Sequence, residues 1–320
     1  MTQSPIAREV RFVSIPEGLH QERVDAALSR LLGLSRSTVV TLIENGEITR
    51  KGRALTKSDR VNTDDYLEIT MPAAATEPVL TATPIADFKV VYDDSDVIVV
   101  DKPAGVAAHP SPGWRGPTVI GGVIAAGYQV STSGAAERQG VVHRLDVGTT
   151  GLMVIAKNEN SYSNLKQQFR DRTVTKVYHA LVQGHMDPTE GTIDAPIDRH
   201  PREDYRFAVV ADGKPSITHY KALEFFPAVS LLEIELETGR THQIRVHFSA
   251  LRHPLVGDMT YGADHTIAER LEITRPWLHA RELKFIHPAS GAEIAFFSEY
   301  PADLTRSLEI LANGQTSQPQ

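Results

Sequence analysis

The sequence predicts an α+β protein: a mostly antiparallel mixed sheet with flanking helices, preceded by a small N-terminal α/β unit. A proline-rich stretch divides the chain into a short and a long unit. Within the long unit, strand-like and helix-like segments follow one another without the regular alternation of a doubly wound parallel sheet. The length of 320 residues also favours two domains over one.

The domain boundaries follow from local composition. Residues 72–86 contain three prolines and several small residues, so we expect a linker there. This linker separates a small unit at 14–71 from a large unit at 87–312. Residues 313–320 are mostly Gly, Gln, Ser and Pro, and we expect them to form a disordered tail.

In the small unit, two apolar stripes at helical spacing predict two helices. The stripes consist of Val24, Leu28, Leu31 and Leu32, and then of Val39, Leu42 and Ile43. Ser35 is suited to cap the second helix and Gly46 to end it. The alternating segments 47–49 and 66–70 are typical of half-buried strands.

In the large unit, apolar runs and alternating segments predict five strands, at 97–100, 152–156, 174–182, 216–224 and 231–236. Helices are predicted at 118–127 and at 158–170, where Tyr162, Leu165 and Phe169 share one face. A third helix is expected to begin near Thr241, with Ile244, Phe248 and Leu251 on its apolar face.

The composition limits the possible classes of protein. Hydrophobic residues make up 41% of the chain, which is enough for real cores, and cysteine is absent, which excludes disulfides and cysteine-based zinc sites. No apolar run is long enough for a membrane span, and the first residues lack the apolar core of a signal peptide, so a cytoplasmic protein is expected. The net charge of −7 argues mildly against general nucleic-acid binding, but local clusters of cations matter more than the sum.

One carboxylate stands out in the segment 143–152, which reads HRLDVGTTGL. Asp146 lies between a cation and a turn of small residues, with no second acid nearby and no metal-ligand spacing around it. This pattern favours a nucleophile or an electrostatic group over half of an acid/base pair. We expect Asp146 to follow a strand at 140–142, where side chains commonly form sites; the alternative is an ordinary turn aspartate.

About a hundred residues later, the segment 238–247 reads TGRTHQIRVH and is rich in cations. On the helix predicted there, Arg245 lies beside the apolar stripe, where it could hold a carboxylate through two parallel hydrogen bonds. The alternative is a surface cation on an amphipathic helix. Tyr178 lies in the middle of a predicted strand, where a tyrosine is most often a core or cross-strand aromatic.

Metal and cofactor sites are not expected. His242, His247 and His253 are spaced by five and six residues, which does not align two ligands on one helix face, and no Glu or Cys completes a set. No glycine-rich phosphate loop precedes a helix, so nucleotide cofactors are not expected either.

The segments around Asp146 and Arg245 together resemble RluA/RluD-type pseudouridine synthases, which act on large-subunit ribosomal RNA, and the likeness is greatest to the RluD-like branch. The resemblance implies that Asp146 is the catalytic nucleophile, that Arg245 pairs with it and that Tyr178 packs against the target base. It also implies that Arg144 enters the RNA in place of the everted nucleotide; a structural ion pair is the alternative. The sequence departs from the family pattern at Thr150, where serine is usual.

The small unit resembles the S4-type RNA-binding domain. The likeness rests on the segments Arg23–Asp25, Ser35–Ser37, Leu42–Gly46 and Lys51–Arg53, and it departs at Asp64–Asp65, where the family usually has Gly-Asp. It implies a phosphate-binding surface, extended by the large unit, that consists of Arg36, Arg50, Lys51, Arg53 and Arg240. A solvated charged face is the ordinary alternative.

The predicted reaction is therefore isomerisation of uridine to pseudouridine in folded 23S ribosomal RNA, after extrusion of the target base and without a cofactor. Whether Asp146 forms a covalent bond or abstracts a ribose proton is left open by the sequence. The alternatives are a transfer-RNA pseudouridine synthase, a catalytically silent RNA-binding factor of ribosome assembly, and an unrelated hydrolase with an aspartate nucleophile. A monomer is the simplest expectation for the oligomeric state.

Overall fold

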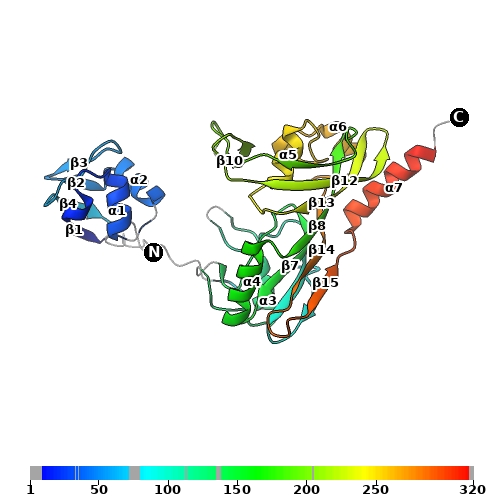
Figure 1. Ribbon diagram of the computed structural model, residues 1–320, viewed down its shortest axis with the longest axis horizontal. Helices are drawn as coiled ribbons and strands as arrows, with labels where there is room; N and C mark the ends of the chain where they lie inside the picture. Colours follow the sequence, from blue (N-terminus) through cyan, green and yellow to red (C-terminus); the bar gives the residue numbers. More distant parts are fainter. Residues whose placement is uncertain are drawn as a thin grey trace, which may run out of the picture. The chain divides into compact units, whose positions relative to one another are not determined.

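The computed structural model describes residues 9–316 except 33, 35, 72–79, 112–113, 135–137 and 204. The chain divides into two compact units, Met1–Pro78 and Val79–Gln320. Each unit has an apolar core of its own. Figure 1 shows that each unit contains both helices and strands. Among the described residues, no helix is long and apolar enough to cross a membrane.

The N-terminal unit packs two helices on a four-stranded antiparallel sheet with the strand order β1-β4-β2-β3. Its elements are β1 Val10–Ser14, η1 Glu17–Leu19, α1 Val24–Leu32, α2 Arg36–Glu44, β2 Ile48–Arg50, β3 Arg53–Ala54 and β4 Tyr66–Thr70. Gly46 follows α2 with a φ of +71°, a conformation that glycine adopts without strain. Strand β1 was not predicted, because all but one of its residues are exposed and it shows no buried alternation.

The C-terminal unit is built on a nine-stranded sheet with the order β5-β6-β7-β14-β8-β13-β12-β9, in which β15 also pairs with β14. The sheet contains β5 Lys89–Asp93, β6 Val97–Lys102, β7 Thr150–Ala156, β8 Thr175–Gln183, β9 Glu190–Asp194, β12 Ile217–Phe226, β13 Val229–Leu236, β14 Leu278–Ile286 and β15 Glu293–Phe297. Only the β7–β14 pair is parallel. The predicted α+β class with a mostly antiparallel mixed sheet is therefore confirmed.

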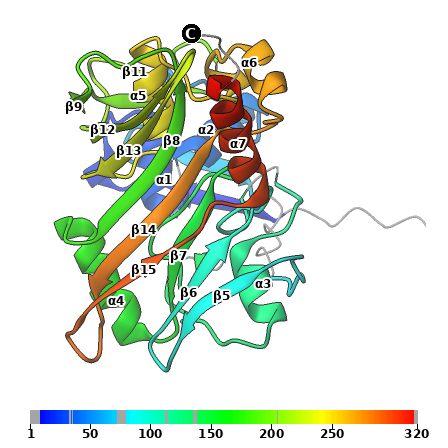
Figure 2. The same ribbon diagram turned by 90° about the vertical axis from the view of Figure 1, so that its right-hand side faces the viewer.

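Short strands and helices complete this unit (Figure 2). They are β10 Ile197–Arg199, β11 Phe207–Val209, α3 Val119–Ala125, α4 Glu159–Asp171, α5 Gln243–Ala250, η3 Met259–Tyr261, α6 His265–Arg270 and α7 Ala302–Thr316. Thr118 and Asn158 cap α3 and α4 by accepting hydrogen bonds from backbone N–H groups of the first turn. The main core joins residues of β6, β7, β8 and β13 to α3 and α5, so the sheet and both helices share one apolar interior.

Three expectations about local structure were wrong. Residues 140–142 form one bridge, between Val141 and Ile155, instead of a strand, because Gly140 adopts a φ of +73° against β7 and the chain crosses that strand at one point. Helix α5 ends at Ala250, which leaves Leu251 exposed and outside the apolar stripe. The predicted tail at 313–320 begins too early, because α7 continues through Thr316; residues 317–320 lie outside the described part of the chain.

Candidate active site

A cleft of about 550 Å³ opens on the large unit. The loop that precedes β7 forms one side of the cleft, α4 and β8 form another, and the end of β13 with the start of α5 forms a third. The three residues predicted to be catalytic, Asp146, Tyr178 and Arg245, all line this cleft. The structure thus brings together residues that are up to 99 positions apart in the sequence.

Asp146 lies in a tight turn before β7. The Thr149 N–H donates a hydrogen bond to the Asp146 carbonyl at 3.0 Å. The turn is fixed from outside as well, since Gly105 N–H and an Arg275 Nη1–H donate to the Val147 and Gly148 carbonyls, both at 2.9 Å. Such a turn presents the carboxylate, whose side chain is 17% exposed, to the cleft.

Lys102 also contacts this turn, and its side chain is fully buried. Its ammonium donates to the carbonyl oxygens of Pro103, Val106 and Val147 at 3.0, 2.8 and 3.2 Å. Burial lowers the pKa of Lys102 to about 7, and the nearby Asp146 carboxylate opposes this shift. These three carbonyl contacts show how the segment 101–106 holds the Asp146 turn.

Arg245, on α5, uses three nitrogens for two carboxylates. Its Nη1 donates to Asp146 Oδ2 at 3.2 Å, while Nε and Nη2 donate to Asp258 Oδ2 and Oδ1 at 2.6 and 2.9 Å. The guanidinium also stacks over the ring of Tyr261, 4.9 Å from its centroid. Burial alone would lower the pKa of Arg245, but the two carboxylates raise it, so the guanidinium stays charged.

Asp258 was not predicted. Its side chain is 1% exposed, and it binds Arg245 through the two parallel hydrogen bonds that we expected for Asp146. Asp146 instead receives a single hydrogen bond from this guanidinium. An aspartate in a loop thirteen residues beyond the arginine gives no periodic signal, so the sequence offered no way to choose it.

Tyr178 lies in the middle of β8, between Ile234 of β13 and Ala280 of β14. It is buried at the floor of the cleft. Burial, and then the charge of Asp146, raise the pKa of the phenol, so it stays protonated at neutral pH. Both expectations for this residue are compatible with its place, because it packs in the core and also faces the carboxylate.

His242 is a further polar residue beside Asp146. It precedes α5 with a left-handed φ of +57°. Its Nδ1 lies 2.8 Å from the Tyr261 hydroxyl and its Nε2 lies 3.8 Å from Asp146 Oδ2. Burial lowers the pKa of the imidazole, although Asp146 opposes the shift, so the ring is neutral at neutral pH. From the sequence, His242 was considered only as a metal ligand.

The lining of the cleft is strongly cationic. Eight lining side chains are Lys or Arg and only two are carboxylates, so the cleft attracts anions although the whole chain is acidic. The cations are Arg138, Arg144, Lys166, Arg170, Arg172, Lys176, Arg240 and Arg245. Arg144 and Arg240 were predicted as RNA contacts; the cations of α4 and β8 were missed, although Lys166 and Arg170 have the four-residue spacing that places two side chains on one helix face.

The RNA contacts predicted in the N-terminal unit differ from one another. Arg50 is half-buried and pairs with Asp65 at 2.6 Å, which occupies its guanidinium within the unit. Lys51 and Arg53 are exposed at the connection between β2 and β3. The Arg36 side chain lies outside the described part of the structure.

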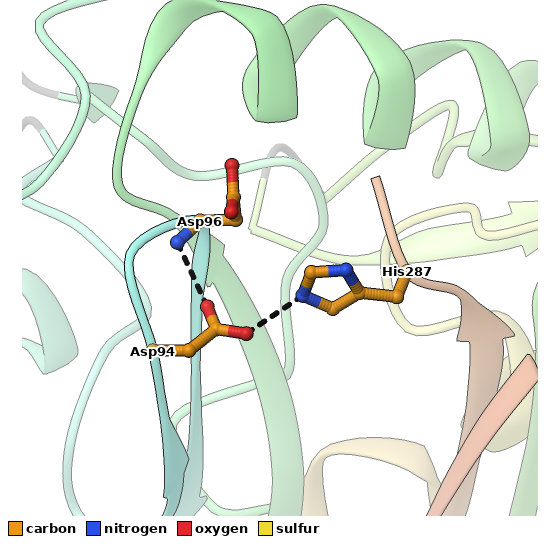
Figure 3. Close-up of side chains that lie close together, drawn as sticks. All are labelled: Asp94, Asp96 and His287. Atoms are coloured by element: carbon orange, nitrogen blue, oxygen red, sulfur yellow. Dashed lines mark hydrogen bonds and ion pairs between the residues drawn. The ribbon is translucent and has the colours of Figure 1, made fainter. Parts of the chain in front are cut away.

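Among the described residues, one side-chain group has ligand atoms close enough for a metal: Asp94, Asp96 and His287 (Figure 3). These atoms are already engaged. His287 Nδ1 faces the N–H groups of Ala289 and Ser290, so its Nε2 carries the proton and donates to Asp94 Oδ2 at 2.7 Å. Burial opposes ionisation of Asp94, but backbone N–H groups lower its pKa to about 2. A hydrogen-bonded loop accounts for the group, and we assign no metal to it.

A mixed sheet that presents an ion-paired aspartate in a cationic cleft fits an enzyme acting on a polyanion. A family model described as RNA pseudouridylate synthase matches residues 96–250, which include Asp146 and Arg245. The chain is 54% identical over 301 residues to an RNA pseudouridine synthase from Mycobacterium bovis, an alignment that covers 94% of this chain and 98% of the relative.

Two further comparisons agree. The chain is 37% identical over 311 residues to the ribosomal large subunit pseudouridine synthase D of Pseudomonas aeruginosa, covering 94% of this chain and 95% of that protein. The solved structure of human RNA pseudouridylate synthase domain containing 1 superposes with a TM-score of 0.55 at 26% identity, covering 78% of this chain and 99% of the human one. The chain belongs to the RNA pseudouridine synthases and is an isomerase, so the predicted resemblance to the RluA/RluD type is confirmed.

Proposed function

We propose that this enzyme isomerises specific uridines in 23S ribosomal RNA, with Asp146 as the catalytic nucleophile or base. The observation that carries the proposal is the 3.2 Å contact between Asp146 and Arg245 in a cationic cleft that also contains Tyr178. The preference for large-subunit RNA rests on the likeness to ribosomal large subunit pseudouridine synthases from three bacteria, at 35–38% identity.

The reaction conserves all atoms of the nucleotide. The bond between N1 of uracil and C1′ of ribose breaks, and a bond between C5 and C1′ forms; C5 loses a proton and N1 gains one. Asp146 acts at the ribose while the uracil detaches and rotates. Arg245 orients the carboxylate through the hydrogen bond from its Nη1. The protonated Tyr178 phenol packs against the uracil and is available as a hydrogen-bond donor.

The rim of the cleft suits the extrusion of the base. Taking a uridine out of a stem-loop costs a few kcal/mol, which phosphate contacts and stacking must offset. The exposed Lys166, Arg170 and Arg240 side chains are placed for phosphates, and Arg144 for the space that the base leaves. This is the role we propose for these four cations.

We further propose that the N-terminal unit is an S4-like domain that contacts RNA through Lys51 and Arg53. Both side chains are exposed, whereas Arg50 is held by Asp65. A cytoplasmic location belongs to the same proposal, because ribosomal RNA is modified where the subunits are assembled. Replacement of Lys51 and Arg53 with alanine should weaken RNA binding without changing the cleft.

The decisive experiment is pseudouridine mapping of total RNA from cells with and without the gene, followed by assays of purified enzyme on transcripts of 23S rRNA and tRNA. We expect sites in 23S rRNA that disappear with the gene and that reappear with wild-type enzyme but not with Asp146→Asn. If the sites that depend on the gene lie only in tRNA, the substrate is tRNA and not 23S rRNA. No lost site, together with retained RNA binding, would identify a catalytically silent RNA-binding factor.

A further inference from the structure

The segment Asp258–Tyr261 reaches Asp146 along two paths. Asp258 holds Arg245, and Arg245 donates to Asp146. Tyr261 contacts His242, and His242 faces the same carboxylate oxygen of Asp146. We propose that His242, in its neutral Nε2–H form, is a second positioning residue for Asp146 and that Tyr261 selects this form. The inference rests on the proposed catalytic role of Asp146.

The hydrogen bonds of Tyr261 assign the tautomer. The backbone N–H of Phe207 donates to the Tyr261 hydroxyl oxygen at 3.1 Å. Among the described residues, His242 Nδ1 at 2.8 Å is the acceptor within reach of the hydroxyl hydrogen. Nδ1 is therefore the acceptor of the imidazole, and a neutral ring carries its proton on Nε2. Nε2 is the atom that faces Asp146.

The surroundings of the ring favour this neutral form and restrict its orientation. Burial lowers the pKa of His242, so the ring is not an imidazolium at neutral pH. Tyr261 and Phe207 contact the ring edge-on, at centroid distances of 5.6 and 5.7 Å. The left-handed backbone of His242 and the hydrogen bond from Val246 N–H to its carbonyl fix the start of α5, from which the side chain projects.

The geometry defines what His242 contributes. Asp146 Oδ2 receives one charge-assisted hydrogen bond, from Arg245. The His242 Nε2–H lies 3.8 Å away, a distance that a small displacement of either side chain closes to a hydrogen bond. Bound RNA displaces water from the cleft, and a carboxylate that loses water needs a protein donor to stay ionised. His242 supplies this donor without adding a positive charge, so it orients Asp146 without neutralising it.

A matched pair of substitutions separates the two ring nitrogens. In His242→Gln, the side-chain amide NH₂ can occupy the place of Nε2 and keep a donor toward Asp146. In His242→Asn, the shorter amide reaches the place of Nδ1 and keeps the contact with Tyr261, but it leaves no donor facing Asp146. We expect His242→Asn to lower kcat about tenfold or more, and His242→Gln to stay within about threefold of wild type. KM for the RNA transcript and Tm should change little in both variants.

Several outcomes would overturn the assignment. One is a kcat for His242→Asn within twofold of wild type, and another is an equal loss in the two variants. A rise in KM at constant kcat would make His242 an RNA contact, and a kcat loss that follows a fall in Tm would make it a residue of the fold. Tyr261→Phe, which keeps the ring beneath Arg245 but removes the hydroxyl, should also lower kcat.

The tautomer can be read without any assay of activity. In ¹⁵N-labelled full-length enzyme at pH 7.5, long-range ¹H–¹⁵N correlation spectra distinguish the two neutral forms of histidine from the cation. The His242 signals, assigned by their absence from His242→Asn, should show a protonated Nε2. A protonated Nδ1, or a cationic ring, would refute the geometry. If wild-type enzyme modifies no RNA at all, the proposed function fails, while this measurement still decides the tautomer.

Discussion

The back of the cleft and its rim differ in the burial of their ionisable side chains. Behind Asp146, the ionisable groups of Lys102, Arg245 and Asp258 are buried and bind fixed partners at hydrogen-bond distance. On the rim, Lys166 and Arg170 are exposed to solvent. Buried pairs are costly to desolvate and therefore tolerate little change in geometry, whereas exposed cations bind phosphates in many arrangements. The enzyme thus combines one rigid carboxylate with an adaptable surface.

Asp146→Asn tests the centre of this arrangement and should have the largest effect. We expect turnover to fall by about a thousandfold or more, because the amide is neither a nucleophile nor a base. RNA affinity should be kept, since the rim is untouched. The unfolding free energy should also change little, because Arg245 retains Asp258. Single-turnover assays measure the turnover, and denaturant titration measures the unfolding free energy. Normal turnover in this variant would exclude a catalytic role for Asp146.

Asp258→Asn tests the buried ion pairs at the back of the cleft. It removes the charge that Arg245 binds with two hydrogen bonds and leaves a buried guanidinium paired with Asp146 alone. We expect a loss of about 3 kcal/mol in unfolding free energy and a lower kcat. The matched control is Glu237→Gln on the rim, which weakens the exposed contacts of Glu237 with Arg172 at 3.3 Å and with His219 at 2.8 Å and should cost less than about 1 kcal/mol. Equal losses would contradict the contrast between back and rim.

The pH dependence of stability tests three histidines of the large unit whose pKa values are lowered in the folded protein. Burial lowers the pKa of His143 to about 3 and that of His179 and His279 to about 4. Between pH 6.5 and 4 the unfolded chain binds protons that the folded one does not, so stability falls as the pH falls. Each residue contributes up to about 1.4 kcal/mol per pH unit. Denaturant titrations of wild type and His143→Gln over this range should show a shallower slope for the variant.

The double variant Lys166→Gln and Arg170→Gln tests the exposed cations of the rim and should have the smallest effect. We expect KM for RNA to rise several-fold at unchanged kcat and Tm, and the slope of log affinity against log salt to decrease by up to about 1.4, or about 0.7 for each phosphate that the variant no longer neutralises. Lys221→Gln with Arg306→Gln removes the same charge from exposed positions outside the cleft lining and serves as the control. An identical salt dependence in both pairs would show that total charge, not its place on the rim, governs binding.

What the sequence could predict depended on periodicity. The central strands and helix α4 repeat apolar residues at regular spacing, and the predicted segments at 152–156 and 158–170 nearly coincide with β7 and α4. Strand β14, in the middle of the sheet, was missed, because its sequence LHARELKFI interrupts the apolar alternation with charged residues. Its pairing with β7 and β8 is decided by tertiary contacts that no local pattern contains.

The candidate active site likewise contains residues that the sequence could select and residues that only the fold brings into place. Asp146, Tyr178 and Arg245 were selected by motif and resemblance, and the structure places them in one cleft. Their supports, Asp258 and Tyr261, were not selected, since a loop residue acquires such a role only when the fold brings α5 beside it. The α4 cations were visible as charges, but which face of the helix borders the cleft is a property of the packed unit.

The position of β14 has a consequence for biosynthesis. This strand lies between β7, which begins directly after the Asp146 turn, and β8, which bears Tyr178 (Figure 2). Residues 278–286 leave the ribosome more than ninety positions after Tyr178. A nascent chain that already contains every proposed catalytic residue still has a gap where the middle of its sheet belongs. A chain that stops before residue 278 is therefore expected to lack isomerase activity, because its sheet has no strand between β7 and β8.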